Sequence, residues 1–144
     1  MANLNYRISS VSETDTRTKV SVRGMEFTID EPLNAGGTNQ GPNPVEYLIG
    51  ALAGCMSITA RLVAKQMGIK VNGLAIEVEG DLNTAKFMGR TQEGRSGYEE
   101  IRVTIHADLD ASGEQKLQWL QAVKARCPVS DNIGNPTPVR ISLK

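Results

Sequence analysis

The chain has 144 residues, of which 40% are hydrophobic and 22% charged, so it suits one domain with a core and is too apolar for a disordered chain. Its 16 basic residues balance 16 acidic ones, which argues against a nucleic-acid or anionic-membrane partner, because both favour a basic surplus. The N-terminus lacks the order of a signal peptide, and the most apolar stretch, residues 47–60, is too short to span a bilayer. We therefore expect a cytoplasmic protein whose two cysteines form no permanent disulfide.

The first part of the chain predicts a meander of antiparallel strands. Residues 4–10 form a weak first strand, and residues 18–22 begin a second one with alternate apolar positions. After a turn at Arg23 and Gly24, apolar and polar residues alternate again over residues 25–29. This alternation is typical of strands that are buried on one face.

A strong helix start follows at the end of a loop rich in Gly, Asn and Pro. Asn43 can cap the helix, Pro44 fits its first position, and Glu46 lies where a carboxylate can bond back to the cap. The helix should run to about Gln66 and stop near Gly68. Its first half is apolar nearly all round, so it must be buried on every side. One small domain has few elements to cover such a helix, and a second copy from a partner subunit would complete the cover.

The second half of the chain predicts two strands, a helix and a closing strand. Apolar residues alternate over residues 74–78 and 101–109, on either side of a polar loop. A capping box at residues 112–115 opens a helix, and Cys127-Pro128 interrupts it before a further short turn of helix. The apolar side of the helix carries Leu117, Leu120 and Val123, and the closing strand carries Val139, Ile141 and Leu143. Strands in runs indicate an α+β fold on an antiparallel sheet, in a single domain over residues 1–144.

The two cysteines differ in their local surroundings. Cys55 lies in the apolar helix, where a free cysteine often serves as a small hydrophobe and its pKa is raised. It needs a cation that its own helix does not offer, because Arg61 is about 9 Å along the axis and on another face. Cys127 lies at the cap of a short helix if Pro128 begins one, and the helix dipole there favours a thiolate. The local environment alone makes Cys127 the stronger nucleophile. For each cysteine the alternative stays open that its side chain only fills space in the packed interior.

Other polar candidates have structural interpretations. Nine residues separate Glu46 from Cys55, about 13.5 Å and the opposite face of one regular helix, so their side chains cannot touch. His106 shares the outward side of its strand with charged residues and fits a solvated position. One histidine and two distant cysteines lack the spacing of a metal site. No phosphate-binding loop is present either, so the sequence indicates no metal and no cofactor.

Three motifs resemble the OsmC/Ohr family, the osmotically inducible and organic hydroperoxide resistance proteins. They are GPNPVEYL at residues 41–48, GALAGC at residues 50–55 and CPVS at residues 127–130. Either cysteine motif alone would be weak, but the two together are specific, and the resemblance covers nearly the whole chain. It implies an antiparallel sheet with a long buried central helix, in an intertwined homodimer with two active sites at the subunit interface.

The resemblance also implies a cysteine-based peroxidase. Cys55 would attack an organic hydroperoxide and become a sulfenic acid, and Cys127 would then form a disulfide with it. A dithiol reductant, for which a lipoyl-type compound is one candidate, would reopen the disulfide. Hydrogen peroxide would be a poorer substrate. The second hypothesis is a stress-related binding protein of the same fold, which holds an apolar small molecule without fast peroxide chemistry.

The family holds its thiolate with an arginine and a glutamate, and the match here is looser. Its glutamate directly follows the Asn-Pro pair, where this chain has Val45, with Glu46 one place later. One residue turns a helical side chain by about 100°, so Glu46 is kept only as a candidate. Arg17 is assigned to the arginine because it lies just after the first turn, and Arg23 is the reserve.

Overall fold

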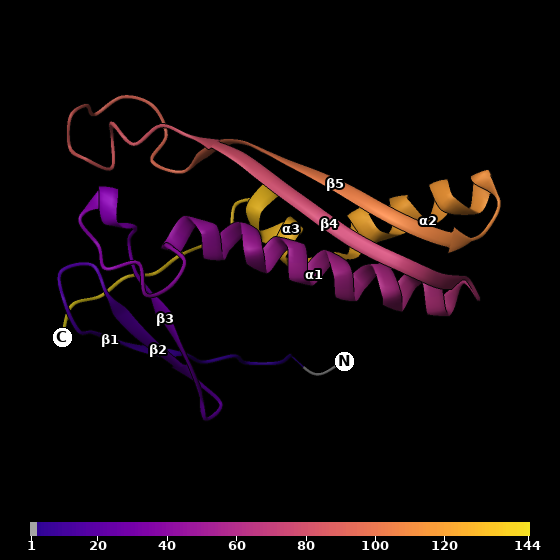
Figure 1. Cartoon of the computed structure of the whole chain (residues 1–144), viewed down its shortest axis with the longest axis horizontal. Helices are drawn as coiled ribbons and strands as arrows, with labels where there is room; N and C mark the ends of the chain where they lie inside the picture. Colours follow the sequence, from indigo (N-terminus) through magenta and orange to yellow (C-terminus); the bar gives the residue numbers. More distant parts are fainter. Residues whose placement is uncertain (1–2) are drawn as a thin grey trace. The chain divides into compact units, whose positions relative to one another are not determined.

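A computed structural model of the chain describes residues 3–144 and divides into two compact units, one ending at Leu48 and one beginning at Ile49 (Figure 1). The first contains a three-stranded antiparallel sheet and the second a two-stranded one. The α+β class agrees with the sequence prediction. The prediction of one antiparallel sheet is wrong for the single chain, because no described strand of one sheet hydrogen-bonds to the other.

The N-terminal unit is the predicted meander, with its first strand displaced. Its strands are β1 (Ser9–Ser12), β2 (Thr18–Val22) and β3 (Met25–Ile29). The turn between β2 and β3 has positive φ at Arg23 and at Gly24, which suits a tight hairpin. The first strand begins at Ser9 rather than Leu4 because β2 is short, and β1 pairs only with Thr18–Ser21.

A buried carboxylate shapes the loop that leads from β3 into the long helix. Asp30 is fully buried and accepts hydrogen bonds from the hydroxyls of Thr16 and Thr38 and from the N–H groups of Glu31, Thr38 and Gln40. These bonds, above all the one from the Thr38 hydroxyl, hold the pKa of Asp30 well below its usual range. Asp30 therefore stabilises the fold at pH values above the usual carboxyl pKa. This stabilisation is lost as the pH falls and the native carboxylate becomes protonated. The loop includes a 3-10 turn, η1 (Leu33–Ala35).

The long helix α1 (Pro44–Gln66) has the predicted ends. Glu46 accepts from the N–H of Asn43 at 2.8 Å, and the Asn43 side chain accepts from the N–H of Glu46 at 2.9 Å, so the predicted capping box is present. Gly68 follows the helix with φ of 68°, the left-handed conformation that glycine adopts without strain. The mean hydropathy of the most apolar 18-residue window of α1 is 1.6. By length and composition alone, α1 could cross a membrane, although its apolar stretch was predicted to be too short for this. The core helix of a water-soluble protein meets the same criterion.

The chain itself covers only one side of α1. The buried side includes Leu52, Met56 and Val63, whereas Ile58 on the other side is 73% exposed and Leu62 is 46% exposed. The single chain thus leaves one side of the helix open, and the predicted cover of that side by a second copy stays a prediction. The helix carries apolar residues on both sides, and among the described residues those on the second side stay exposed.

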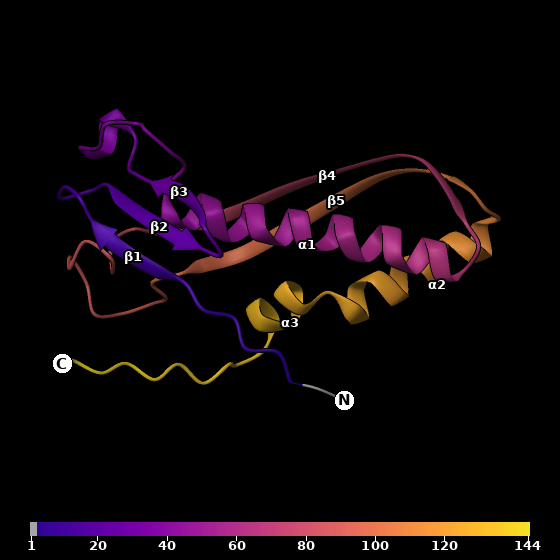
Figure 2. The same cartoon turned by 90° about the horizontal axis from the view of Figure 1, so that it is seen from below.

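The C-terminal unit places α1 against a hairpin and two further helices. These elements are β4 (Lys70–Leu82), β5 (Tyr98–Asp110), α2 (Gly113–Arg126) and α3 (Pro128–Gly134). β4 and β5 are antiparallel, and in Figure 2 the length of α1 runs between this hairpin and the two C-terminal helices. The predicted capping box of α2 is present, with Ser112 and Gln115 bonded to each other's N–H groups.

The core of this unit centres on a residue that the sequence prediction missed. Trp119 is buried, and its indole Nε1 donates a hydrogen bond of 2.9 Å to the carbonyl of Ala60 on α1. Val123 is fully buried as predicted, but Leu117 is 64% exposed. The expected apolar side of α2 was thus partly wrong, because the largest side chain turns the helix so that Trp119 packs against α1.

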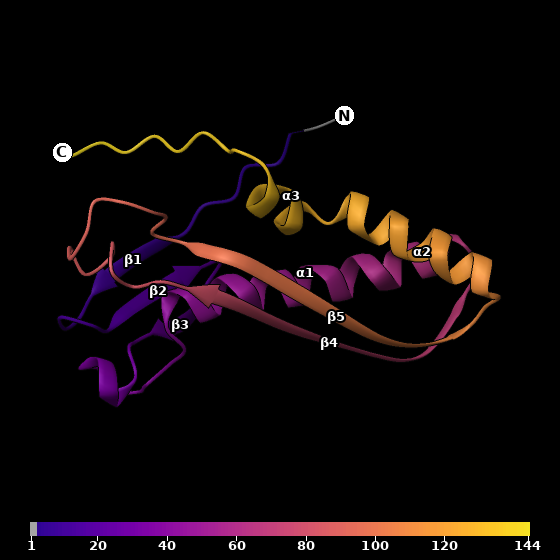
Figure 3. The same cartoon turned by 90° about the horizontal axis from the view of Figure 1, so that it is seen from above.

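The predicted closing strand does not form in the single chain. Residues 135–144 contain no strand, and Figure 3 draws them as an extended trace leaving α3. Val139, Ile141 and Leu143 are between 79% and 100% exposed. A strand needs a neighbouring edge for its backbone hydrogen bonds, and the part of the chain from residue 3 onward pairs no edge with this segment.

Candidate active site

The two cysteines meet within the C-terminal unit. Cys55 lies on α1 and Cys127 at the junction of α2 and α3. Both are free thiols, and Cys55 packs against the buried cluster that contains Cys127. Cys127 packs in a cluster with Leu52 and Met56, the residues on either side of Cys55 on the buried face of α1. The fold thus brings together two thiols that are far apart in the sequence.

Cys127 occupies the helix cap that the sequence predicted. Pro128 is the first residue of α3, and the Cys127 Sγ accepts a hydrogen bond of 3.5 Å from the N–H of Ser130. Burial nevertheless raises the pKa of Cys127, and the neighbouring Cys55 thiol raises it further, against the lowering effect of the Ser130 N–H. The cap that favours a thiolate at Cys127 is thus opposed by burial, which its local sequence does not reveal, since only 1% of the residue is exposed. Which thiol is the stronger nucleophile stays a prediction.

Cys55 is the more accessible of the two thiols. It is partly buried, and the neighbouring Gly54 is exposed with open space where a side chain would stand. Cys55 therefore lies at the border between the buried and the exposed sides of α1. Cys127, by contrast, is buried.

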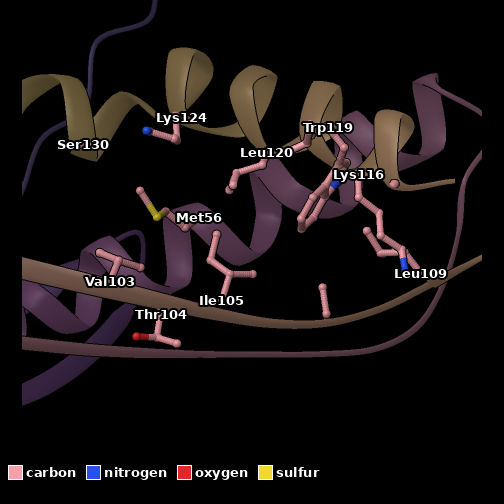
Figure 4. Close-up of a pocket in the computed structure, with 13 residues that line it drawn as sticks. Met56, Val103, Thr104, Ile105, Leu109, Lys116, Trp119, Leu120, Lys124 and Ser130 are labelled. Atoms are coloured by element: carbon pink, nitrogen blue, oxygen red, sulfur yellow. The ribbon is translucent and has the colours of Figure 1, made fainter. Parts of the chain in front are cut away.

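Two hollows are lined by neighbours of the cysteines. The larger, with a volume of about 770 Å³, runs between β5 and α2 (Figure 4), and the smaller has a volume of about 400 Å³. They share Met56, Val103 and Ser130. Met56 packs against Cys127, and the Ser130 N–H bonds to its sulfur. Both hollows therefore reach the surroundings of the thiol pair.

The other predicted site residues belong to the N-terminal unit. Arg17 forms an ion pair with Glu13, with 3.0 Å between Nε and Oε2. Arg23 lies at the exposed hairpin turn, and the Glu46 carboxylate takes part in the helix cap. Whether Arg17 or Arg23 contacts the Cys55 thiolate, and whether Glu46 assists it, stay predictions.

The sequence prediction missed three cations that line the hollows. Lys116 and Lys124 border the larger one and Arg95 the smaller one. They were passed over because a lysine or arginine on an exposed helix or loop carries no sequence signal of its own. His106 is exposed, as predicted, and lies 3.2 Å from a carboxylate oxygen of Glu77. Among residues 3–144, no three His, Cys, Asp or Glu side chains are grouped to hold a metal ion.

Comparison with known proteins identifies the family. The family model described as OsmC-like protein matches residues 37–142, a range that contains both cysteines. The chain belongs to the OsmC-like protein family. A curated relative is the hydroperoxide reductase of Mycoplasma pneumoniae, 24% identical over 139 residues, which are 96% of this chain and 93% of the relative.

Solved structures agree with this OsmC-like fold. The OsmC-like protein from Mycoplasma pneumoniae has a TM-score of 0.80 and 25% identity, over 92% of this chain and 89% of that one. An organic hydroperoxide resistance protein from Elizabethkingia anophelis has a TM-score of 0.62 and 20% identity, over 91% and 89% of the two chains. The family resemblance in the sequence is thus confirmed.

Proposed function

We propose that this OsmC-like protein is a thiol-dependent peroxidase that reduces organic hydroperoxides, and hydrogen peroxide less well. The observation that carries the proposal is that a partly exposed thiol, Cys55, packs against the cluster that holds a buried one, Cys127. The names of its relatives, a hydroperoxide reductase and an organic hydroperoxide resistance protein, support the same chemistry.

The electrons that reduce the peroxide come from the two sulfurs, and an external dithiol restores them. The Cys55 thiolate attacks the distal peroxide oxygen, the O–O bond breaks, and the alkoxide leaves and takes a proton to become an alcohol. Cys55 is then a sulfenic acid, and the Cys127 sulfur displaces its hydroxyl as water to form a disulfide. A dithiol, with a lipoyl-type compound as one candidate, reduces the disulfide and becomes oxidised itself. The raised pKa of Cys127 suits a partner that stays protonated until Cys55 has reacted.

We propose that the working form is a homodimer in the cytoplasm. The exposed side of α1, with Ile58 and Leu62, and the exposed apolar residues near the C-terminus both lack cover in the single chain, and such surfaces mark protein contacts. In this proposal Arg17, with Arg23 as the reserve, supplies the guanidinium that holds the Cys55 thiolate. Glu46 orients that arginine.

Cumene hydroperoxide titration of the reduced protein tests the peroxidase. We expect about one equivalent to remove both thiols, and Cys55→Ser to remove all peroxide consumption. Cys127→Ser is the matched variant, because it keeps the attacking thiol and should consume a single equivalent while a sulfenic acid accumulates, seen as a mass increase or by dimedone trapping. Continued turnover by the Cys55→Ser protein would refute the assignment.

The larger hollow favours a second candidate function, a binding protein without fast peroxide chemistry. Its volume of about 770 Å³ lies in the range of small-molecule pockets, and most of its lining residues are apolar. Stopped-flow oxidation separates the two candidates. Thiol loss no faster than that of free cysteine would favour the binding protein.

A further inference from the structure

We propose that the groove between β5 and α2 binds a linear amphiphile with one anionic head, and that Lys116 holds this head. This site goes beyond the peroxidase chemistry and does not depend on it. The proposal rests on the shape of the groove, the chemistry of its walls and the position of its cations.

The groove is long and apolar. One wall consists of alternate residues of β5 on the same face of the strand, namely Val103, Ile105, Ala107 and Leu109. With about 3.3 Å for each residue, this wall extends for about 20 Å. The opposite wall comes from α2, with Leu117, Trp119 and Leu120, and Figure 4 shows Leu120 and Ile105 on facing sides. Such a shape fits an extended alkyl chain better than a compact ring.

Two lysines mark the ends of the α2 wall. Lys116 and Lys124 are eight positions apart, which is about two turns and 12 Å along the helix. Figure 4 draws Lys116 near Leu109 at one end, and Lys124 near Met56 and Ser130 at the other. Within residues 3–144, neither lysine forms an ion pair with a carboxylate. Both are exposed at the rim, where a charged head can stay partly hydrated.

The helix dipole distinguishes the two lysines. Lys124 lies in the last turn of α2, where the partial negative charge of the helix end complements an ammonium group. Lys116 is near the beginning of α2, where the helix has no partial negative charge to stabilise an ammonium group. A carboxylate or phosphate head therefore gains more by pairing with Lys116, and its tail then extends past Leu120 toward Met56 and the cysteine pair.

The free side of α1 from a second copy fits the groove less well than an anionic amphiphile does. The apolar surface that the chain leaves free on α1 carries Ile58, Leu62 and the cation Arg61. It has no carboxylate to offer to Lys116. Charge complementarity thus favours an anionic small molecule in the groove, and leaves the free side of α1 for contact with another subunit.

Fluorescent fatty-acid binding tests this site in the full chain. The probe is cis-parinarate, and the protein is the Cys55→Ser variant, so that thiol oxidation cannot interfere. We expect saturable binding that laurate displaces about tenfold or more better than dodecanol, which has the same tail without the charge, as expected for a hydrogen bond between charged groups. Dodecyltrimethylammonium, with the opposite charge, should compete least.

Variants then locate the head and the tail. Lys116→Ala should weaken laurate binding about tenfold and leave dodecanol binding unchanged, whereas Lys124→Ala should have a smaller effect. Lys65→Ala, an exposed lysine of α1 outside the groove, is the matched control. Ala107→Phe should fill the groove and weaken both ligands, with circular dichroism as the check of folding.

Three results would overturn the proposal. They are the absence of probe binding, equal affinity for laurate and dodecanol, and a larger loss with Lys124→Ala than with Lys116→Ala. Probe binding that disappears as the protein self-associates would assign the groove to a second copy, and would overturn it as well. Cumene hydroperoxide turnover is measured separately, so a failed peroxidase and a failed binding site are distinguishable.

Discussion

The two sides of α1 have similar residues and opposite surroundings. On one side Val63 is 1% exposed and Ala60 fully buried, while on the other Ile58 is 73% exposed. Isoleucine and valine have nearly the same preference for burial. The difference in exposure therefore reflects which side of α1 the rest of the chain covers. Cys55 lies between the covered side and the exposed side.

A charge on each side of α1 should have the largest effects, and of different kinds. Val63→Asp places a carboxylate in the completed core and should cost about 4 kcal/mol or more in the free energy of unfolding, because the charge has no partner there. Ile58→Asp should leave the secondary structure intact and dissociate the proposed dimer. Urea unfolding and light scattering after gel filtration measure the two outcomes. An Ile58→Asp protein that unfolds like Val63→Asp would show that the two sides are equally essential to the single chain.

A smaller loss is expected on the buried side when Trp119 is changed to Phe. The substitution removes the donor to the Ala60 carbonyl, and an unsatisfied buried acceptor costs about 1–3 kcal/mol. Leu117→Ala on the same helix is the control, because this side chain is 64% exposed and should change stability by about 0.5 kcal/mol or less. Equal losses in the two variants, measured by urea unfolding, would argue against the packing of Trp119 on α1.

The smallest effect is a difference in rate between the two thiols. Iodoacetamide reacts with thiolates, and the pKa of Cys127 is raised mainly by burial, so Cys127 should be alkylated after Cys55 at mildly alkaline pH. Each unit of raised pKa lowers the thiolate population roughly tenfold. Peptide mass spectrometry over time gives both rates, and the protein in urea, where they should converge, is the control. Faster labelling of Cys127 in the folded protein would reverse the assigned order of the thiols.

Local signals in the sequence were sufficient for much of the fold. The Asn43–Glu46 and Ser112–Gln115 capping boxes lie within four residues each, so their donors and acceptors are visible in the sequence, and both are present in the structure. The turn at Gly68 and the proline that begins α3 were predictable for the same reason.

Predictions that depended on distant partners were less successful. The alternation of apolar residues near the C-terminus indicated a strand, but no edge in the described chain pairs with it. The side of α2 that faces the core was misplaced because the Ala60 carbonyl that attracts Trp119 lies on another helix. The low pKa suggested for Cys127 by its cap was outweighed by burial, which comes from residues of α1.

By itself the sequence determined the family, the two cysteine motifs and the ends of α1, because these depend on residue identity and on contacts a few positions apart. The tertiary structure alone decided that Cys55 and Cys127 lie in one packed cluster, which of them is buried, and that cations on α2 border an apolar groove. The physical reason is that burial and side-chain proximity arise between segments that are distant along the chain, so that only the packed fold specifies them.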